Sequence, residues 1–329
     1  MSKYRSALPQ IGSRLFLTDG GLETTLIFHN GIDLPHFASF ALLDTPEGRR
    51  ALGDYFLPYI EAARRSRAGF VLEAPTWRAN ADWGARLGYA QEALAVVNRA
   101  AIELMAELRR AHEGPEMPMV ISGNIGPRGD GYVAGAEMAP EEAAEYHGAQ
   151  IAAFAGTEAD MVSAFTMTTV NEALGIVLAA GRYDLPVVIS FTLETDGRLP
   201  NGATLQEAIE IIDAATSEAP AYYMINCAHP THFAGTIGNG GDWVGRIRGI
   251  RANASRRSHA ELDSAPDLDA GDPVELAQQY QDLLRALPQL RVFGGCCGTD
   301  HRHVEHICAS CGIIDGGADM HIEAPARAP

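Results

Sequence analysis

The sequence has no run of about 18 apolar residues, the length that a membrane-spanning helix needs. Its first residues also lack the apolar core of a secretion signal. Basic residues are scarce, because 25 Lys and Arg stand against 42 Asp and Glu and give a formal net charge of −17. A surface that follows nucleic-acid phosphates needs the opposite sign. We therefore expect a cytoplasmic protein that binds neither membranes nor nucleic acid.

Cysteine is also scarce, and its placement is not that of a disulfide framework. The chain of 329 residues has an odd number of cysteines, all in its last third: Cys227, Cys296, Cys297, Cys308 and Cys311. Disulfide scaffolds are short secreted chains with an even number of cysteines. In a reducing compartment, a cluster of this kind more often serves metal or thiol chemistry.

The sequence instead alternates between two kinds of segment. Short apolar runs, typical of strands buried on both faces, alternate with longer segments of helical periodicity. The predicted strands are 14–18, 69–73, 119–123, 160–164, 186–191, 222–226, a weaker 244–250, and 290–294. The predicted helices are 49–68, 91–108, 140–155, 170–180, 205–214, 272–287 and 303–310.

Repeated strand–helix units predict an α/β protein with a parallel sheet. Eight units fit a closed (β/α)8 TIM barrel better than an open, doubly wound sheet, although the same pattern is compatible with both. We expect a single barrel domain over residues 1–315. Residues 231–273 are too long for a minimal barrel and predict an excursion between the sixth and eighth strands. Residues 316–329 are expected to form a disordered tail.

Two of the predicted strand ends carry cysteines that suit a metal site. Adjacent Cys296 and Cys297 can reach one ion only where the backbone turns, because neighbours in an extended strand point to opposite sides. The glycines that flank them permit such a turn. Cys227 ends a strand two places earlier, and closure of the barrel can bring it across. Three thiolates with a fourth position open suit a catalytic zinc ion.

Two other interpretations of the cysteines stay open. They could be small buried residues at tight strand ends. Alternatively, Cys308 and Cys311 could join Cys296 and Cys297 in a closed structural zinc site, with histidines of the segment 301–306 as further candidate ligands. At positions i and i+3 of a predicted helix, however, the two later cysteines could simply pack one face.

Three motifs together resemble the homocysteine S-methyltransferase family: Asp19-Gly-Gly-Leu-Glu-Thr, Asn226-Cys227 and Gly294-Gly-Cys-Cys-Gly-Thr. The resemblance runs from about Leu15 to Ile307. It implies a homocysteine-binding (β/α)8 barrel, zinc held by Cys227, Cys296 and Cys297, and no catalytic residue beyond the metal site. It also implies that Asp19 binds the amino group of the acceptor. The other implied substrate-binding residues are Gly20, Gly21, Thr76, Thr166 and Asn226.

Two positions depart from the family pattern. Phe165 stands where the family commonly has a Glu that holds the amino group of homocysteine. Arg78 stands where a Tyr or Gln often lies near the methyl donor. A cation there would repel a cationic donor unless it pairs with a carboxylate or points away.

The function that the resemblance implies is zinc-dependent methyl transfer to a zinc-bound thiol. The donor would be a sulfonium, S-methylmethionine or S-adenosylmethionine, or an ammonium compound; the acceptor would be homocysteine, giving methionine. The alternatives are methylation of a different thiol or other acceptor, a different zinc enzyme on the same barrel, and a non-catalytic zinc- or thiol-binding protein. The expected partners are small molecules, and a homo-oligomer is left open.

Overall fold

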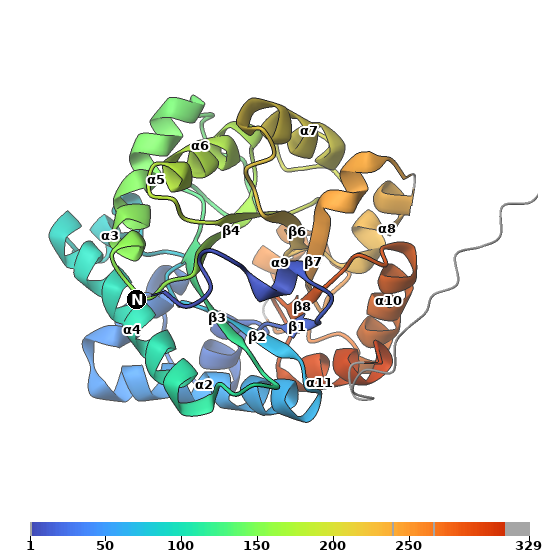
Figure 1. The fold of residues 1–329 in the computed structure, drawn as a ribbon, viewed down its shortest axis with the longest axis horizontal. Helices are drawn as coiled ribbons and strands as arrows, with labels where there is room; N and C mark the ends of the chain where they lie inside the picture. Colours follow the sequence, from blue (N-terminus) through green and yellow to red (C-terminus); the bar gives the residue numbers. More distant parts are fainter. Residues whose placement is uncertain (1, 239, 266, 313–329) are drawn as a thin grey trace, which may run out of the picture.

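A computed structural model describes residues 2–238, 240–265 and 267–312. Eight parallel strands close into a barrel in chain order, with helices around it (Figure 1). This confirms the predicted (β/α)8 TIM barrel and shows that the open sheet is wrong. The strands are β1 (Phe16–Leu17), β2 (Gly69–Glu73), β3 (Met119–Ile125), β4 (Met161–Met167), β5 (Val187–Phe191), β6 (Tyr222–Asn226), β7 (Ile247–Ala252) and β8 (Val292–Gly295).

The long helices surround the strands, and short ones lie in the loops. The long helices are α2 (Pro46–Arg65), α4 (Gln91–His112), α5 (Pro140–Ala155), α6 (Val170–Gly181), α7 (Leu205–Thr216), α8 (Pro230–Gly238), α10 (Pro273–Ala286) and α11 (His301–Ser310). The short α-helices are α1 (Leu22–Thr24), α3 (Ala81–Arg86) and α9 (His259–Asp263). The other short helical segments are η1 (Pro9–Ile11), η2 (Thr25–His29), η3 (Pro35–Phe37), η4 (Ser39–Asp44) and η5 (Asp242–Arg246). None of the described helices is both long enough and apolar enough to cross a membrane.

Local sequence signals explain several helix starts. Thr45 precedes Pro46 and accepts a hydrogen bond from the Gly48 N–H at the start of α2. Thr204 and Glu207 form a capping box at the start of α7, in which each side chain binds the backbone of the other residue. These bonds satisfy N–H groups that have no partner within a helix.

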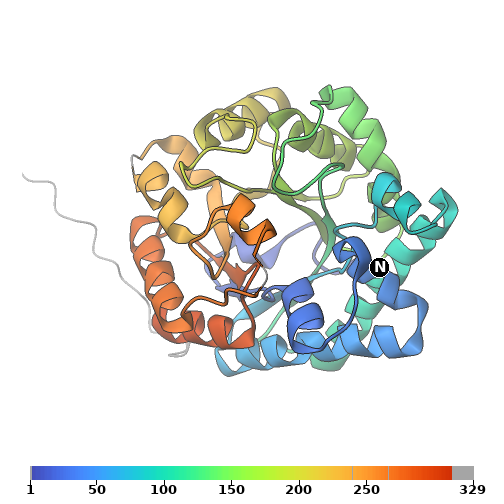
Figure 2. The same cartoon turned by 180° about the vertical axis from the view of Figure 1, so that it is seen from behind.

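The N-terminal segment closes one end of the barrel. Leu8 packs inside the barrel against a separate cluster of apolar side chains from the strands. Gln10 is fully buried, and its Nε2 donates to the Tyr222 hydroxyl at the start of β6. Because the strands are parallel, their carboxyl ends all open at the other end (Figure 2). That end is where side chains remain free to form a site.

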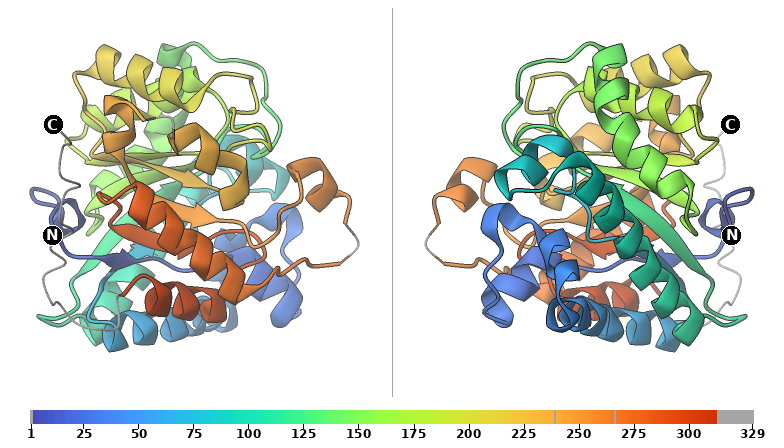
Figure 3. Two further views of the ribbon diagram at one scale, coloured as in Figure 1. Left: turned by 90° about the vertical axis from the view of Figure 1, so that its right-hand side faces the viewer. Right: turned by 90° about the vertical axis from the view of Figure 1, so that its left-hand side faces the viewer.

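The predicted strands and helices overlap the observed ones, with ends that differ by at most four residues, and the seventh strand is shifted at both ends. The prediction of 244–250 is wrong at its start, because residues 242–246 form η5 and β7 runs over Ile247–Ala252. The predicted excursion at 231–273 therefore contains α8, η5 and β7, and only the part after β7 reaches over the barrel end. There α9 projects from the end opposite the N-terminal segment (Figure 3). The predicted tail at 316–329 lies outside the described residues.

Candidate metal centre

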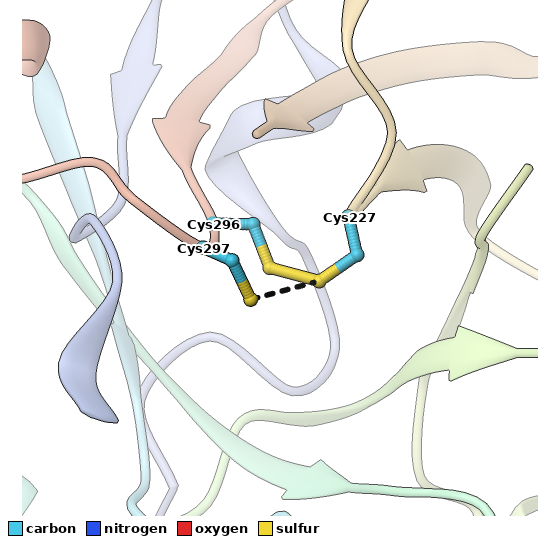
Figure 4. Close-up of side chains that lie close together, drawn as sticks. All are labelled: Cys227, Cys296 and Cys297. Carbon is cyan, nitrogen blue, oxygen red and sulfur yellow. Dashed lines mark hydrogen bonds between the residues drawn. A yellow bond between two sulfur atoms is a disulfide. The ribbon is translucent and has the colours of Figure 1, made fainter. Parts of the chain in front are cut away.

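The three predicted cysteines meet at the carboxyl end of the barrel. Cys227 directly follows β6, and Cys296 and Cys297 directly follow β8 (Figure 4). Their Sγ atoms all lie within 4.8 Å of one another. The two strands are separated only by β7, so closure of the barrel brings together residues that are far apart in sequence.

Backbone geometry directs the thiols toward one point. Cys227 has a φ of 52°, a left-handed conformation that bends the chain as it leaves β6. After β8 the chain turns at Gly298, which has a φ of 79°. A side chain at Gly294 or Gly295 would overlap the Thr18 or Thr299 side chain respectively. The glycines predicted to permit the turn are therefore required by close packing as well.

Hydrogen bonds fix the backbone of Cys227. Its carbonyl oxygen accepts from Asn253 Nδ2 at 3.1 Å, from His259 Nε2 at 2.7 Å and from Thr192 Oγ1 at 3.3 Å. Its N–H donates to the Arg251 carbonyl at 3.1 Å. These contacts hold the backbone of Cys227 in its left-handed conformation.

In this structure a disulfide joins Cys227 to Cys296, and Cys297 is a free thiol. The sequence did not predict this pairing, because the cysteine pattern is not that of a disulfide framework. Sulfurs in a disulfide cannot act as thiolate ligands, so only the reduced form could hold a metal ion through all three cysteines. The pairing shows that these two sulfurs can approach each other closely.

The cysteine cluster fits a tetrahedral metal ion such as zinc. Sulfur ligands at about 2.3 Å from a tetrahedral ion lie about 3.8 Å from one another. The Sγ atoms of Cys227 and Cys297 are 3.9 Å apart, which is close to that separation. Reduction would free Cys296 Sγ to take the third position, and the cavity would leave the fourth open.

The alternative structural zinc site is not assembled in the described part of the chain. Cys308 and Cys311 are buried and belong to the main hydrophobic core. They are not among the residues of the three-cysteine cluster. His303 Nε2 donates to the Ala270 carbonyl at 2.9 Å, so that histidine serves a structural contact. The interpretation that these two cysteines pack one helix face is therefore favoured.

Tyr132 contacts the thiol of Cys297 and was not predicted. It comes from the segment between β3 and α5, and its hydroxyl lies 2.9 Å from Cys297 Sγ. Its ring stacks on His259, with centroids 4.2 Å apart and planes at 15°. Burial raises the pKa of the Cys297 thiol, and the contact with Tyr132 acts in the opposite direction. The only sequence signal for a loop here was that the segment around Tyr132 is rich in glycine, and this signal does not indicate which residues the loop contacts.

Asp19 lines the same cavity as the cysteines and forms a buried ion pair that the sequence did not reveal. Its Oδ1 accepts from Arg251 Nη1 at 2.6 Å, and its Oδ2 accepts from the Tyr55 hydroxyl at 2.9 Å. Arg251 lies near the end of β7 and is 8% exposed. The predicted boundary of the seventh strand at residue 250 left this arginine out.

Asn226 and Thr166 support each other next to the thiols. Asn226 Oδ1 accepts from the Thr166 N–H at 2.9 Å, and its Nδ2 donates to Thr166 Oγ1 at the same distance. Thr166 has a φ of 62°, so these bonds hold a backbone conformation that a β-branched residue rarely adopts. Asn226 thereby fixes the end of β4 against the end of β6.

The remaining predicted residues divide between the cavity and its support. Gly20 and Gly21 line the cavity, and a side chain at Gly21 would overlap the Cys296 carbonyl. Thr76 is fully buried and donates to the Asn124 carbonyl at 2.7 Å, so its hydroxyl holds a loop. Glu73, which was not among the predicted site residues, ends β2 inside the barrel, where burial raises its pKa to about 7.

A cavity of about 380 Å³ opens above the thiols. It is lined by all three cysteines and by the predicted residues Asp19, Gly20, Gly21, Thr166 and Asn226. Its walls include aromatic side chains, among them Trp77, Trp83 and Phe165. The volume suits small ligands lying over a cluster of thiols.

Comparisons with known proteins agree with this geometry. A model of the family described as homocysteine S-methyltransferase matches residues 16–311. No curated protein matches the chain. Among solved structures, the chain is similar to the homocysteine methyltransferase MmuM from Escherichia coli. The oxidized form has a TM-score of 0.76 and 18% identity, covering 93% of this chain and 99% of that one. The metallated form has a TM-score of 0.73 and 18% identity, covering 92% and 98%. At this identity the likeness to the solved structures shows the fold.

Proposed function

The chain belongs to the homocysteine S-methyltransferase family, and from that premise we propose zinc-dependent methyl transfer from a sulfonium or ammonium donor to a metal-held thiol, with homocysteine as the acceptor. The chain is a methyltransferase by its family, and the proposal adds the metal, the donor class and the acceptor. The observation that carries it is the convergence of Cys227, Cys296 and Cys297 under an open cavity.

Cys227, Cys296 and Cys297 would hold the ion once the disulfide is reduced. Bound zinc would keep the acceptor sulfur deprotonated, and with three cysteinates the site carries a net charge of about −1, which leaves that sulfur nucleophilic. Without such help only a few per cent of a free thiol is thiolate at neutral pH. The hydrogen bonds to the Cys227 carbonyl keep this ligand in position for the reaction.

The residues around the cavity contribute orientation and exclusion of water. The acceptor sulfur forms a bond to the methyl carbon while the donor's own bond to that carbon breaks. The donor then leaves as a neutral thioether or amine, so no general acid is needed. Tyr132 and Phe165 line the cavity close to the thiols. Orientation is effective when the sulfur and the methyl carbon are held about 3–3.5 Å apart.

Asp19 is the proposed partner of the acceptor's amino group. Each of its carboxylate oxygens already accepts one hydrogen bond, from Arg251 or from Tyr55. A carboxylate has about four acceptor positions, so two remain for an ammonium group. The Arg251 ion pair also favours a second candidate function, which is methylation of a thiol that carries no amino group.

The test is methyl transfer by the reduced, zinc-loaded protein. Homocysteine would be incubated with S-methylmethionine, S-adenosylmethionine or glycine betaine, and methionine formation followed. In parallel, 4-mercaptobutyrate, which lacks only the amino group, would replace homocysteine. Preference for homocysteine supports the proposal, whereas equal or better turnover of 4-mercaptobutyrate supports the second candidate.

Matched cysteine variants test the metal. Cys227→Ala should lose both bound zinc and methyl transfer, because two thiolates do not complete the ligand set. Cys308→Ala removes a buried thiol of the core, outside the cavity, and should keep both. Methyl transfer by Cys227→Ala at the wild-type rate, or by a metal-free wild-type protein, would refute zinc dependence.

A further inference from the structure

Arg78 holds an unusual place on the cavity wall. It follows β2, lines the same cavity as the three cysteines and is only 5% exposed. Its guanidinium group lies against two indole rings, with Cζ 3.9 Å from the Trp77 centroid and 3.8 Å from the Trp83 centroid. Contact with two rings restricts the orientation of the group. Its hydrogen bonds can be made only in its own plane, through the N–H donors.

Some of these N–H donors have no partner among the described residues. Nη1 donates to the Gly129 carbonyl at 2.9 Å. Nε is buried without a hydrogen-bond partner, and the described structure gives Nη2 none. In a guanidinium group the Nε–H and one Nη2–H point the same way. Together they form the two-donor edge that matches the two oxygens of a carboxylate.

No carboxylate of the described chain takes this position. Asp130 and Glu23 are near enough to act on the charge of Arg78, but neither forms an ion pair with it. Asp130 Oδ1 instead accepts from the N–H groups of Tyr132 and Val133, at 2.7 and 3.2 Å. Glu23 Oε1 accepts from the Ser39 hydroxyl at 3.1 Å.

The second arginine of the cavity shows the contrast. Arg251 is paired with Asp19 and also donates to Thr18 Oγ1 and to the carbonyls of Gly20 and Gly295. Its charge and its donors are therefore satisfied within the protein. Buried charges without such partners are unfavourable, so an unpaired guanidinium on a cavity wall indicates a place for an anionic group of a ligand.

We propose that Arg78 binds the carboxylate of the methyl donor, so that the enzyme takes small zwitterionic donors, sulfonium or quaternary ammonium acids. This rests on the proposed function, since it assigns the donor of that reaction. A donor with only a positive charge is repelled by Arg78. A zwitterionic donor turns its carboxylate toward Arg78 and its cationic end toward the thiols, where the methyl group is transferred.

Donors matched in size test the assignment. Glycine betaine is compared with choline, in which a hydroxymethyl group replaces the carboxylate. Dimethylsulfoniopropionate is compared with (3-hydroxypropyl)dimethylsulfonium in the same way. In Arg78→Gln, kcat/KM for the carboxylate donors should fall roughly 10- to 100-fold, mainly through KM, as expected on losing hydrogen bonds between charged groups. Arg78→Lys keeps the charge but not the two-donor edge and should give an intermediate loss.

Arg86→Gln is the control. Arg86 stacks on the same Trp83 ring, with Cζ 4.1 Å from its centroid, but it is exposed and does not line the cavity. It should leave every kcat/KM unchanged. The assignment is overturned if Arg78→Gln lowers kcat/KM equally for both members of a donor pair, or if it raises the KM of the thiol acceptor instead of the donor.

A measurement without turnover separates this inference from the proposed function. The carbon isostere of glycine betaine, 3,3-dimethylbutyrate, has the carboxylate but neither the positive charge nor a methyl group that can be transferred. Calorimetric titration of the reduced, zinc-loaded protein should show binding that is weakened by Arg78→Gln and unaffected by Arg86→Gln. Such binding without methyl transfer would refute the function and keep the assignment. Methyl transfer without any effect of Arg78→Gln on this binding would keep the function and refute the assignment.

Discussion

Replacing Arg251 with Met should destabilise the protein strongly, because this side chain joins three strand ends. Its guanidinium group makes an ion pair with Asp19 after β1 and donates to the carbonyls of Gly20 and Gly295, the latter at the end of β8. Met has a similar length but no donors. In Arg251→Met the Asp19 carboxylate, only 3% exposed, would lose its positive partner, and the two carbonyls would lose their donors.

The expected loss of stability follows from the cost of a buried unpaired charge. Removing one partner of a buried ion pair costs about 3–5 kcal/mol. A chain of 329 residues has an unfolding entropy of about 0.7 kcal/mol/K near its midpoint, at about 2.1 cal/mol/K per residue. The melting temperature should therefore fall by about 4–7 °C.

A double-mutant cycle measures the coupling directly. Asp19→Asn, Arg251→Met and the double variant would be compared with wild type by calorimetry under reducing conditions. The double variant leaves no unpaired charge, so its loss should be smaller than the sum of the single losses by about 2 kcal/mol or more. Additive losses, or a drop below about 1 °C for Arg251→Met, would show that the pair does not hold the strand ends together.

Three further predictions concern the barrel end. Burial raises the pKa of Glu73 to about 7, so the folded protein keeps this proton to higher pH than the unfolded chain, whose group titrates near 4.5. As the pH rises from 4.5 to 7, the wild-type protein should lose on the order of 3 kcal/mol of stability. The Glu73→Gln variant should not show this loss. The melting temperatures of the two proteins should therefore differ at pH 8 but not at pH 4.5. Mild oxidation of the metal-free protein should join Cys227 to Cys296 and abolish zinc binding reversibly. It should leave Cys297 open to alkylation, which peptide mapping can check. A disulfide to Cys297 instead would contradict the structure. Phe165→Glu should favour homocysteine over 4-mercaptobutyrate by about tenfold in relative kcat/KM, because a second carboxylate would face the amino group; an unchanged ratio would place that group elsewhere.

The barrel and the cysteine cluster could be predicted because their signals are local. Buried parallel strands are short apolar runs, and β2 and β6 were predicted at their observed bounds. The cluster followed from strand order, since cysteines at the ends of β6 and β8 must face the same end of a closed barrel. The disulfide between Cys227 and Cys296 could not be predicted in the same way, because cysteine sulfurs that lie close together can either hold a metal ion or form a disulfide.

Residues that complete the site through long-range contacts could not be predicted. Arg251 lies in a strand with further arginines, Arg246 just before it and Arg248 within it, and the pattern does not say which of them points inward. Its role depends on Asp19, which is 232 residues away in sequence. Tyr132 lies in a loop without periodicity, and its stacking on His259 joins two segments that the sequence gives no reason to pair.

The pairing of Asp19 with Arg251 also bears on the rate of the proposed reaction. In methyl transfer between a thiolate and a cationic donor, the positive charge of the donor fades in the transition state. An unpaired carboxylate beside that charge would therefore stabilise the bound donor more than the transition state, which slows the reaction. Arg251 neutralises Asp19, which lines the cavity together with the thiols, and the Phe165 ring packs against this arginine. In the proposed reaction, Asp19 would therefore add no uncompensated negative charge beside the donor's cationic end, while Arg78 would hold the donor's carboxylate.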